Sequence, residues 1–128
     1  MRKIVVSIRN GLLSEAVIRT LSNCGEFLTY PASPDTRISI PAQCQAINAD
    51  ILLMEVSYTQ GTTAETRLEE IRQLHSGNPG CKVVLLCDDQ TAPDIASKVT
   101  QLRKDRLIDG FLFTSVSESY LQSSLVSM

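Results

Sequence analysis

The sequence lacks the features by which a chain holds nucleic acid or enters a membrane. Its 12 lysines and arginines are outnumbered by 14 aspartates and glutamates, for a formal net charge of -2, so no positive field is present to hold a polyanion. No stretch approaches the ~18 consecutive apolar residues that span a bilayer, and the apolar run at residues 4–6 is too short for a signal peptide. We therefore expect no direct nucleic-acid or membrane partner and a cytoplasmic location.

Ligands for a metal ion are also scarce. The cysteines Cys24, Cys44, Cys81 and Cys87 are scattered without a C-x-x-C pair, and His75 is the only histidine. The sequence therefore predicts no zinc site and no other metal site. We interpret the cysteines as reduced thiols packed like small apolar side chains in a cytosolic protein. His75 is interpreted as a helix-end residue rather than a catalytic base, because no nucleophile or carboxylate is placed beside it.

Phosphate-binding glycines are missing from the turn after the first apolar segment. Residues 9–13 contain only Gly11, whereas a dinucleotide site needs the spacing G-x-G-x-x-G. A flavin or phosphotransfer site would need a loop rich in glycine, serine and threonine, or a cysteine, at this place. We expect no cofactor. The loop at residues 59–63 could bind an anion through backbone N–H groups, although a helix cap is the simpler account, so a cofactor- or anion-binding protein or enzyme stays the alternative function.

What the sequence does contain is a regular alternation of strand and helix patterns over 128 residues, the length of one domain. Strands are predicted at residues 3–8, 26–32, 50–56, 81–87 and 110–113. Helices are predicted from residue 12 to a stop signal at 23–25, at 41–47, at 64–75, from the capping box Thr91–Asp94 onward, and from Ser117 to the chain end.

Two of the predicted strands are continuously apolar, at residues 51–54 and 83–86, which is typical of strands covered by helices on both faces of a parallel sheet. The helix between them is expected to bury Leu68, Ile71 and Leu74 beneath a charged face that includes Arg67. The predicted fold is therefore α/β: a flavodoxin-like three-layer doubly wound sandwich over residues 1–128, with a five-stranded parallel sheet of order 2-1-3-4-5. Such sheets place their sites at the carboxyl ends of the strands, where Glu55 lies.

Three segments stand out by their order and spacing: residues 49–55 (ADILLME), 79–87 (PGCKVVLLC) and 109–113 (DGFLF). They resemble the third, fourth and fifth strands of the receiver domain of bacterial two-component response regulators. The fifth strand resembles especially that of receivers joined to helix-turn-helix output domains. The resemblance extends over essentially the whole chain, and it implies a signalling protein rather than an enzyme.

The sequence departs from the family pattern at every position that the phosphorylation chemistry uses. A functional receiver has two acidic residues after the first strand, an aspartate ending the third, a threonine or serine after the fourth and a lysine after the fifth. Register through Gly11 places Ile8 and Arg9 at the acidic pair. The other three positions are occupied by Glu55, Cys87 and Thr114.

These replacements remove what magnesium binding and phosphoryl transfer require. An apolar and a cationic side chain supply no carboxylate oxygens for Mg²⁺, and without metal and lysine little neutralises the charge of a phosphoryl group in flight. We therefore expect aspartyl phosphorylation to be lost. Two hypotheses remain for Glu55: it mimics a phosphoaspartate and reaches to Arg9, or it is a relic at an exposed strand end.

The resemblance also implies where a partner would bind. The surface would be the face of the last helix, the last strand and the preceding helix, around Leu102, Phe111, Phe113, Tyr120 and Leu121, used for a protein partner or for homodimerisation. A reactive thiol at Cys87 is a further hypothesis, although the neighbouring carboxylates would raise its pKa. With its end at Met128, the chain is expected to be a stand-alone regulator or the receiver part of a longer transcription factor.

Overall fold

The computed structural model describes residues 1–33, 35, 37–88 and 93–128. Within them, strands alternate with helices in this order: β1 (Arg2–Ser7), α1 (Gly11–Asn23), β2 (Phe27–Pro31), α2 (Ile40–Ile47), β3 (Ile51–Val56), α3 (Ala64–Gly77), β4 (Lys82–Cys87), α4 (Pro93–Lys104), β5 (Gly110–Phe113) and α5 (Glu118–Val126). The strands form one parallel sheet of order β2-β1-β3-β4-β5, which confirms the predicted topology.

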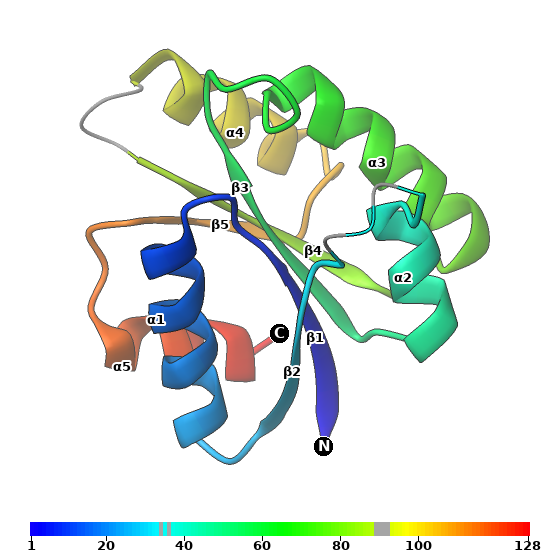
Figure 1. The fold of residues 1–128 in the computed structure, drawn as a ribbon. Coiled ribbons are helices and arrows are strands. Elements are labelled where there is room, and N and C mark those ends of the chain that lie inside the picture. Colours follow the sequence, from blue (N-terminus) through cyan, green and yellow to red (C-terminus); the bar gives the residue numbers. More distant parts are fainter. Residues whose placement is uncertain (34, 36, 89–92) are drawn as a thin grey trace.

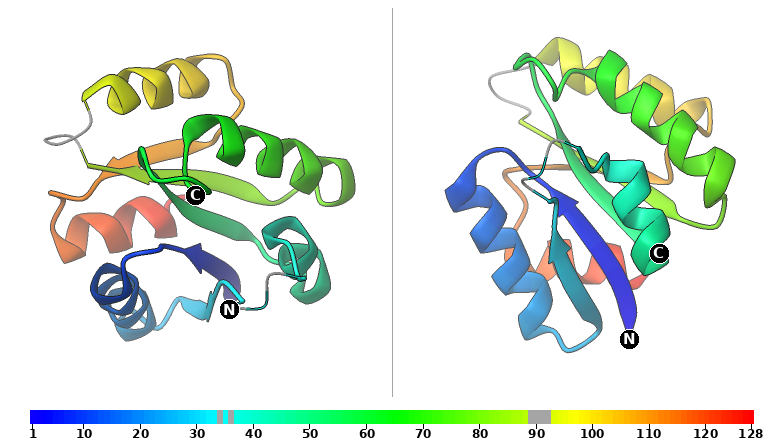
Figure 2. Two further views of the ribbon diagram at one scale, coloured as in Figure 1. Left: turned by 45° about the horizontal axis from the view of Figure 1, so that its top comes forward. Right: turned by 45° about the vertical axis from the view of Figure 1, so that its right-hand side comes forward.

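The sheet lies between two layers of helices, with α1 and α5 on one face and α2, α3 and α4 on the other (Figures 1 and 2). Successive side chains of a strand point to opposite faces. In β3, Ile51 and Leu53 pack against α1 and α5, whereas Leu52 and Met54 pack against α2 and α3. This double coverage is why β3 and β4 are apolar at consecutive positions.

Polar side chains fix where the helices begin and end. The side chains of Asn10, Ser39, Thr63 and Ser117 each accept a hydrogen bond from a backbone N–H in the first turn of the following helix. Helix α2 is capped at its carboxyl end by Asn48, whose φ of 57° and ψ of 55° are left-handed, a conformation that asparagine tolerates better than most residues. The predicted cap Thr91 lies outside the described residues.

Two aspartates fasten the amino edge of the sheet. The Asp50 carboxylate accepts a hydrogen bond from the Lys3 backbone N–H at 2.8 Å, and the Asp109 carboxylate accepts one from the Val83 N–H at 2.8 Å. The backbone N–H groups of both aspartates donate in return to Lys3 and Val83. These reciprocal bonds set the register in which β3 and β5 enter the sheet. No helix within the described residues is long and apolar enough to cross a membrane.

Candidate functional site

A cleft of about 400 Å³ opens at the carboxyl edge of the sheet, where β1, β3, β4 and β5 end. Arg9, Glu55 and Thr114 line it together with Asp88, and Leu13 and Leu86 form apolar parts of its wall. Three of the five positions singled out from the sequence therefore meet at one place. They meet because the carboxyl ends of parallel strands share one edge.

Glu55 is already engaged inside this cleft. The residue is half-buried, and its carboxylate accepts a hydrogen bond from the backbone N–H of Arg9. The Arg9 guanidinium is turned elsewhere, donating to the Gln60 carbonyl oxygen at 2.8 Å. Glu55 thus reaches Arg9 as the sequence suggested, but through the backbone amide rather than the charged side chain.

The other two predicted positions do not line the cleft. Ile8 is half-buried and packs against the cluster formed by α1 and α5. Cys87 is 1% exposed and belongs to the cluster on the opposite face of the sheet, beneath α2, α3 and α4. Its carbonyl oxygen accepts a hydrogen bond from the backbone N–H of Thr114 at 3.0 Å, so the ends of β4 and β5 are held together by main chain.

Arg67 is a residue of the site that the sequence reasoning placed on the solvent face, and the structure corrects this. It is only 2% exposed. Its Nε donates to the backbone oxygen of Glu55 at 2.8 Å, and its Nη2 donates to that of Ser7 at 3.2 Å. Its Nη1 pairs with the Glu70 carboxylate at 3.1 Å. A buried cation on α3 therefore satisfies the end carbonyls of both β1 and β3.

The helical spacing of α3 held the signal that was missed. Arg67 precedes Ile71 by four residues and Leu74 by seven, and both leucine and isoleucine are fully buried. The same spacing puts the arginine on the inner face of the helix. Its charge favoured a solvent-exposed position. The strand-end carbonyls and Glu70 provide partners that offset the free-energy cost of burying that charge.

The donor set of the cleft fits magnesium poorly. Among the described residues that line it, Glu55 and Asp88 carry carboxylates, and the cationic Arg9 shares the lining with them. Among the residues that the structure describes, no three or more histidine, cysteine, aspartate or glutamate side chains are grouped to hold a metal ion. Mg²⁺ prefers near-octahedral oxygen ligands, so this arrangement offers it little.

The loop at residues 59–63, weighed as an anion site, contains the cap of α3. The Thr63 hydroxyl accepts from the Thr66 N–H at 3.3 Å, and the Thr62 hydroxyl donates to the Thr59 carbonyl oxygen at 2.8 Å. The Thr62 N–H also donates to that carbonyl oxygen. These local bonds occupy backbone groups that an anion would need, which favours the helix-cap interpretation.

The residues predicted as a partner surface differ in accessibility. Tyr120 is 56% exposed, whereas Leu121 is 6% exposed and packs in the core with α1, so Leu121 contributes to packing rather than to a surface. Phe111 and Phe113 are half-buried, with ring centroids 5.7 Å apart in an edge-to-face contact. Leu102 is half-buried in a groove between α3 and α4. The docking role of this face stays a prediction.

No family model and no curated protein matches the chain. Solved structures do resemble it. The signal receiver domain of NarL from Mycobacterium tuberculosis, described as a response regulator, is 19% identical with a TM-score of 0.75, covering 98% of this chain and 94% of that one. The chemotaxis protein CheY4 from Vibrio cholerae is 17% identical with a TM-score of 0.73, covering 99% and 98%. A pilus assembly-related protein from Burkholderia pseudomallei is 18% identical with a TM-score of 0.69, covering 99% and 88%.

These likenesses concern the fold. The chain has the α/β fold of response-regulator receiver domains, with five parallel strands in the order 2-1-3-4-5. At identities below one fifth, they do not transfer the activity or partners of any of these proteins to this chain.

Proposed function

We propose that this domain is a phosphorylation-independent receiver, which acts through protein–protein contacts in bacterial signal transduction or transcription regulation. The observation that carries the proposal is the contact between the Glu55 carboxylate and the Arg9 backbone N–H. In a phosphorylated receiver the carboxylate at this strand end must be free to attack a phosphoryl donor. Here the carboxylate is instead hydrogen-bonded to the turn after β1.

The chemistry of the cleft supports the same proposal. Phosphoryl transfer needs positive charge around the moving group, usually from a metal ion and a lysine. Ile8 brings no charge, Thr114 stands where the family has its lysine, and the Arg9 guanidinium is bound to Gln60. The extra methylene of Glu55 also displaces its oxygens from the line of attack by about a bond length.

Glu55 then serves as a fixed connection rather than as an acceptor. Its carboxylate binds the β1–α1 turn, while its backbone oxygen accepts from Arg67 on α3. Three elements of the carboxyl edge are thereby joined at one residue. This supports the hypothesis that the permanent charge of Glu55 holds a single signalling state, because a receiver switches only when its elements can adopt a second arrangement.

The proposal is tested by incubating the protein with acetyl phosphate and Mg²⁺ and measuring its intact mass. We expect no phosphoryl adduct. A matched positive control restores the family residues in one variant, which should take up phosphate if its circular dichroism shows a folded chain; its substitutions are Ile8→Asp, Arg9→Asp, Glu55→Asp, Cys87→Thr and Thr114→Lys. A stable phosphoprotein formed by the unaltered chain would contradict the proposal.

The partner is proposed to dock on the face of α4, β5 and α5, or to be a second copy of the chain. Tyr120 is the most exposed of the residues assigned to this face, and tyrosine is a frequent anchor of interfaces. Tyr120→Ala should weaken self-association or partner binding, as measured by sedimentation or by light scattering on a sizing column. Tyr58→Ala removes a tyrosine of similar exposure, 62%, from the β3–α3 loop and should leave association unchanged. Equal effects of the two variants would remove support for this face.

A further inference from the structure

Two of the four cysteines lie together at the amino edge of the sheet, away from the candidate site. Cys44 is in the second half of α2, and Cys81 directly precedes β4. They are 0% and 2% exposed, and both belong to the core cluster beneath α2, α3 and α4. The role given above to the carboxyl edge makes no use of either thiol.

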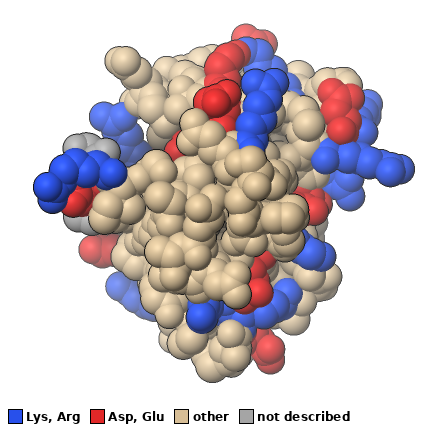
Figure 3. Space-filling model, turned by 90° about the vertical axis from the view of Figure 1, so that its right-hand side faces the viewer, with Lys and Arg blue, Asp and Glu red and all other residues tan. Residues whose placement is uncertain are grey.

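Helix α2 covers this part of the core and is held there by packing and a few hydrogen bonds. The Gln43 side chain accepts from the Ser33 N–H at 2.8 Å and donates to the Pro31 oxygen at 3.0 Å, and the Lys3 ammonium donates to the Ile47 oxygen at 3.1 Å. Its eight residues, IPAQCQAI, include no charged side chain, and none of the ion pairs among the described residues involves α2. Figure 3 views the molecule from the side of α2 and shows a largely uncharged centre. Local opening of this short helix breaks only these bonds and its own packing, and therefore costs less free energy than unfolding of the whole domain.

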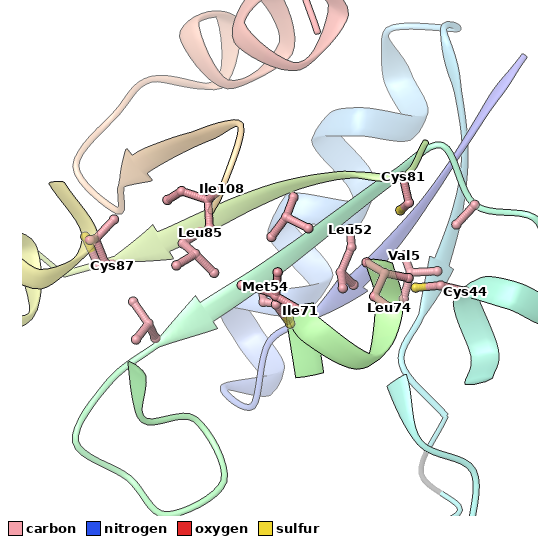
Figure 4. Packing of buried hydrophobic residues seen from close by; sticks show 14 of the residues in the cluster. Val5, Cys44, Leu52, Met54, Ile71, Leu74, Cys81, Leu85, Cys87 and Ile108 are labelled. Carbon is pink, nitrogen blue, oxygen red and sulfur yellow. The ribbon is translucent and has the colours of Figure 1, made fainter. Parts of the chain in front are cut away.

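The chain segments that carry the two cysteines are tied to each other by hydrogen bonds. The Ala49 N–H donates to the Cys44 carbonyl oxygen at 2.9 Å, and the Asn78 side-chain amide donates to the Ala49 oxygen at 3.4 Å. The Cys81 N–H then donates to the Asn78 oxygen at 3.1 Å. In Figure 4 Cys44 lies next to Leu74 and Val5, and Cys81 lies in the same half of the cluster, near the start of β4.

The two thiols also interact directly, and unequally. Their side-chain hydrogen bond raises the pKa of Cys44, to which burial adds, and lowers the pKa of Cys81. Burial and the carboxylates of Asp50 and Asp109 oppose the change at Cys81 without reversing it. While it is protonated, the Cys81 thiol donates to the Lys82 backbone oxygen at 3.8 Å. The opposite pKa changes favour Cys81 as the thiol that ionises and attacks, and Cys44 as the thiol that keeps its proton.

We propose that Cys44 and Cys81 are a redox modification site, at which a hydroperoxide converts the two thiols into a reversible disulfide. The Cys81 thiolate attacks one peroxide oxygen and breaks the O–O bond, which gives a sulfenic acid and releases hydroxide, or an alkoxide from an organic peroxide. The Cys44 sulfur then attacks the Cys81 sulfur and expels the hydroxyl group, which leaves as water with the Cys44 proton. Two thiols are oxidised by two electrons and one peroxide is reduced.

The disulfide would join the middle of the uncharged helix to the start of β4. Both sulfur atoms are covered, so the peroxide enters when α2 opens locally, and the new bond then holds α2 closed. A cross-link between residues 37 apart (81 − 44 = 37) constrains the unfolded chain and raises the thermal unfolding midpoint, by an amount that depends on strain. The cross-link uses no residue of the carboxyl edge, so this proposal does not depend on the proposed function.

The experiment oxidises the reduced, folded protein with hydrogen peroxide and maps its non-reduced tryptic peptides by mass spectrometry. Cleavage after lysine and arginine places Cys44 in peptide 38–67 and Cys81 in peptide 73–82. We expect these two peptides linked, with a mass loss of two hydrogen atoms that a thiol reductant reverses. The variant Cys24→Ala with Cys87→Ala should form the same link, and the oxidised protein should unfold at higher temperature than the reduced one.

Three results would overturn the proposal. One is a disulfide that contains Cys24 or Cys87, another is oxidation that stops at a single-cysteine sulfinic acid, and the third is four alkylatable thiols after treatment. The mapping uses the unaltered chain, so the outcome does not depend on whether a Cys44→Ala variant folds. That variant serves only as a check, because it should abolish both the linked peptides and the oxidant-dependent rise in the unfolding midpoint.

Discussion

The two edges of the sheet are built from similar residues but use them differently. At the amino edge, Asp50 and Asp109 each accept a backbone N–H from the neighbouring strand, and their bonds fix strand register. At the carboxyl edge, Glu55 and Arg67 also bind backbone groups, and Glu55 lines an open cleft. Hydrogen bonds between charged side chains and the backbone thus stabilise the fold at the amino edge. At the carboxyl edge they engage the carboxylate at the position that receivers use for phosphoryl transfer.

Among the substitutions that compare the two edges, a change of Arg67 should lower the free energy of unfolding most. Arg67→Met leaves the carbonyls of Ser7 and Glu55 without this donor and Glu70 without its cation, so the free energy of unfolding should fall by about 3 kcal/mol. Arg72→Met is the matched control, because Arg72 pairs with Glu69 on the same helix but is 67% exposed; its cost should stay below about 1 kcal/mol. Urea unfolding followed by circular dichroism measures both. Equal losses of unfolding free energy in the two variants would mean that Arg67 does not hold the ends of β1 and β3 together.

Asp109→Ala tests the amino edge in the same way. Val83 is fully buried, and the substitution removes the carboxylate that accepts its N–H. The free energy of unfolding should fall by about 2 kcal/mol, which is the cost of a buried unpaired donor. Asp105→Ala removes a carboxylate that accepts a hydrogen bond from the exposed Gln101 side chain at 3.0 Å and should change stability by less than about 0.5 kcal/mol. If both aspartates behave alike, Asp109 has no special role in register.

Glu55→Gln should have a smaller effect on stability and a local effect on dynamics. Glutamine keeps an acceptor oxygen but loses the charge, and charge-assisted hydrogen bonds are roughly twice as strong as neutral ones. The Arg9 amide proton should therefore exchange with solvent several-fold faster, with a stability loss of about 1 kcal/mol or less. Glu15→Gln, on the exposed side of α1, should not alter Arg9. An unchanged exchange rate of the Arg9 amide proton would show that the charge of Glu55 does not stabilise the turn after β1.

The ion pair between Glu65 on α3 and Lys98 on α4 should give the smallest effect. The pair is 2.9 Å long and exposed, and the Lys98 ammonium lowers the pKa of Glu65. A lowered folded-state pKa gives stability that is present above the unfolded-state pKa and is lost as the pH falls through the folded-state pKa. The urea midpoint of unfolding should fall slightly less on acidification in Glu65→Gln than in the unaltered protein. Added salt should remove this difference between the two proteins. A difference that persists in high salt would contradict a screened surface pair.

The fold could be predicted because the local sequence pattern of each segment indicated a strand or a helix. The apolar runs of β3 and β4 and the helical spacing between them require a parallel sheet covered on both faces. The strand-end rule then placed Glu55 and Thr114 at one edge, and the structure brings both to the cleft. The predicted boundaries differ by a residue or two, as for β1, which ends at Ser7 instead of Ile8.

The contacts within the site could not be predicted in the same way. The bond from Glu55 to the Arg9 amide depends on the path of a turn, which side-chain periodicity does not describe. Leu121 was assigned to the partner surface from the family resemblance, but Leu121 and Leu125 are four residues apart and are the buried residues of α5. Burial of Arg67 follows from partners in β1, β3 and α3, which lie far apart in the sequence except for Glu70.

The central claim is that the carboxyl edge is held in one state without phosphate. Its most direct test is a two-dimensional amide NMR titration of the protein with Mg²⁺ and beryllofluoride, a mimic of the phosphoryl group, followed at Arg9, Glu55 and Thr114. We predict that these three amide signals do not move, while the variant with the restored family residues shifts at the same positions. Saturable shifts of Arg9 and Glu55 in the unaltered protein would contradict the claim.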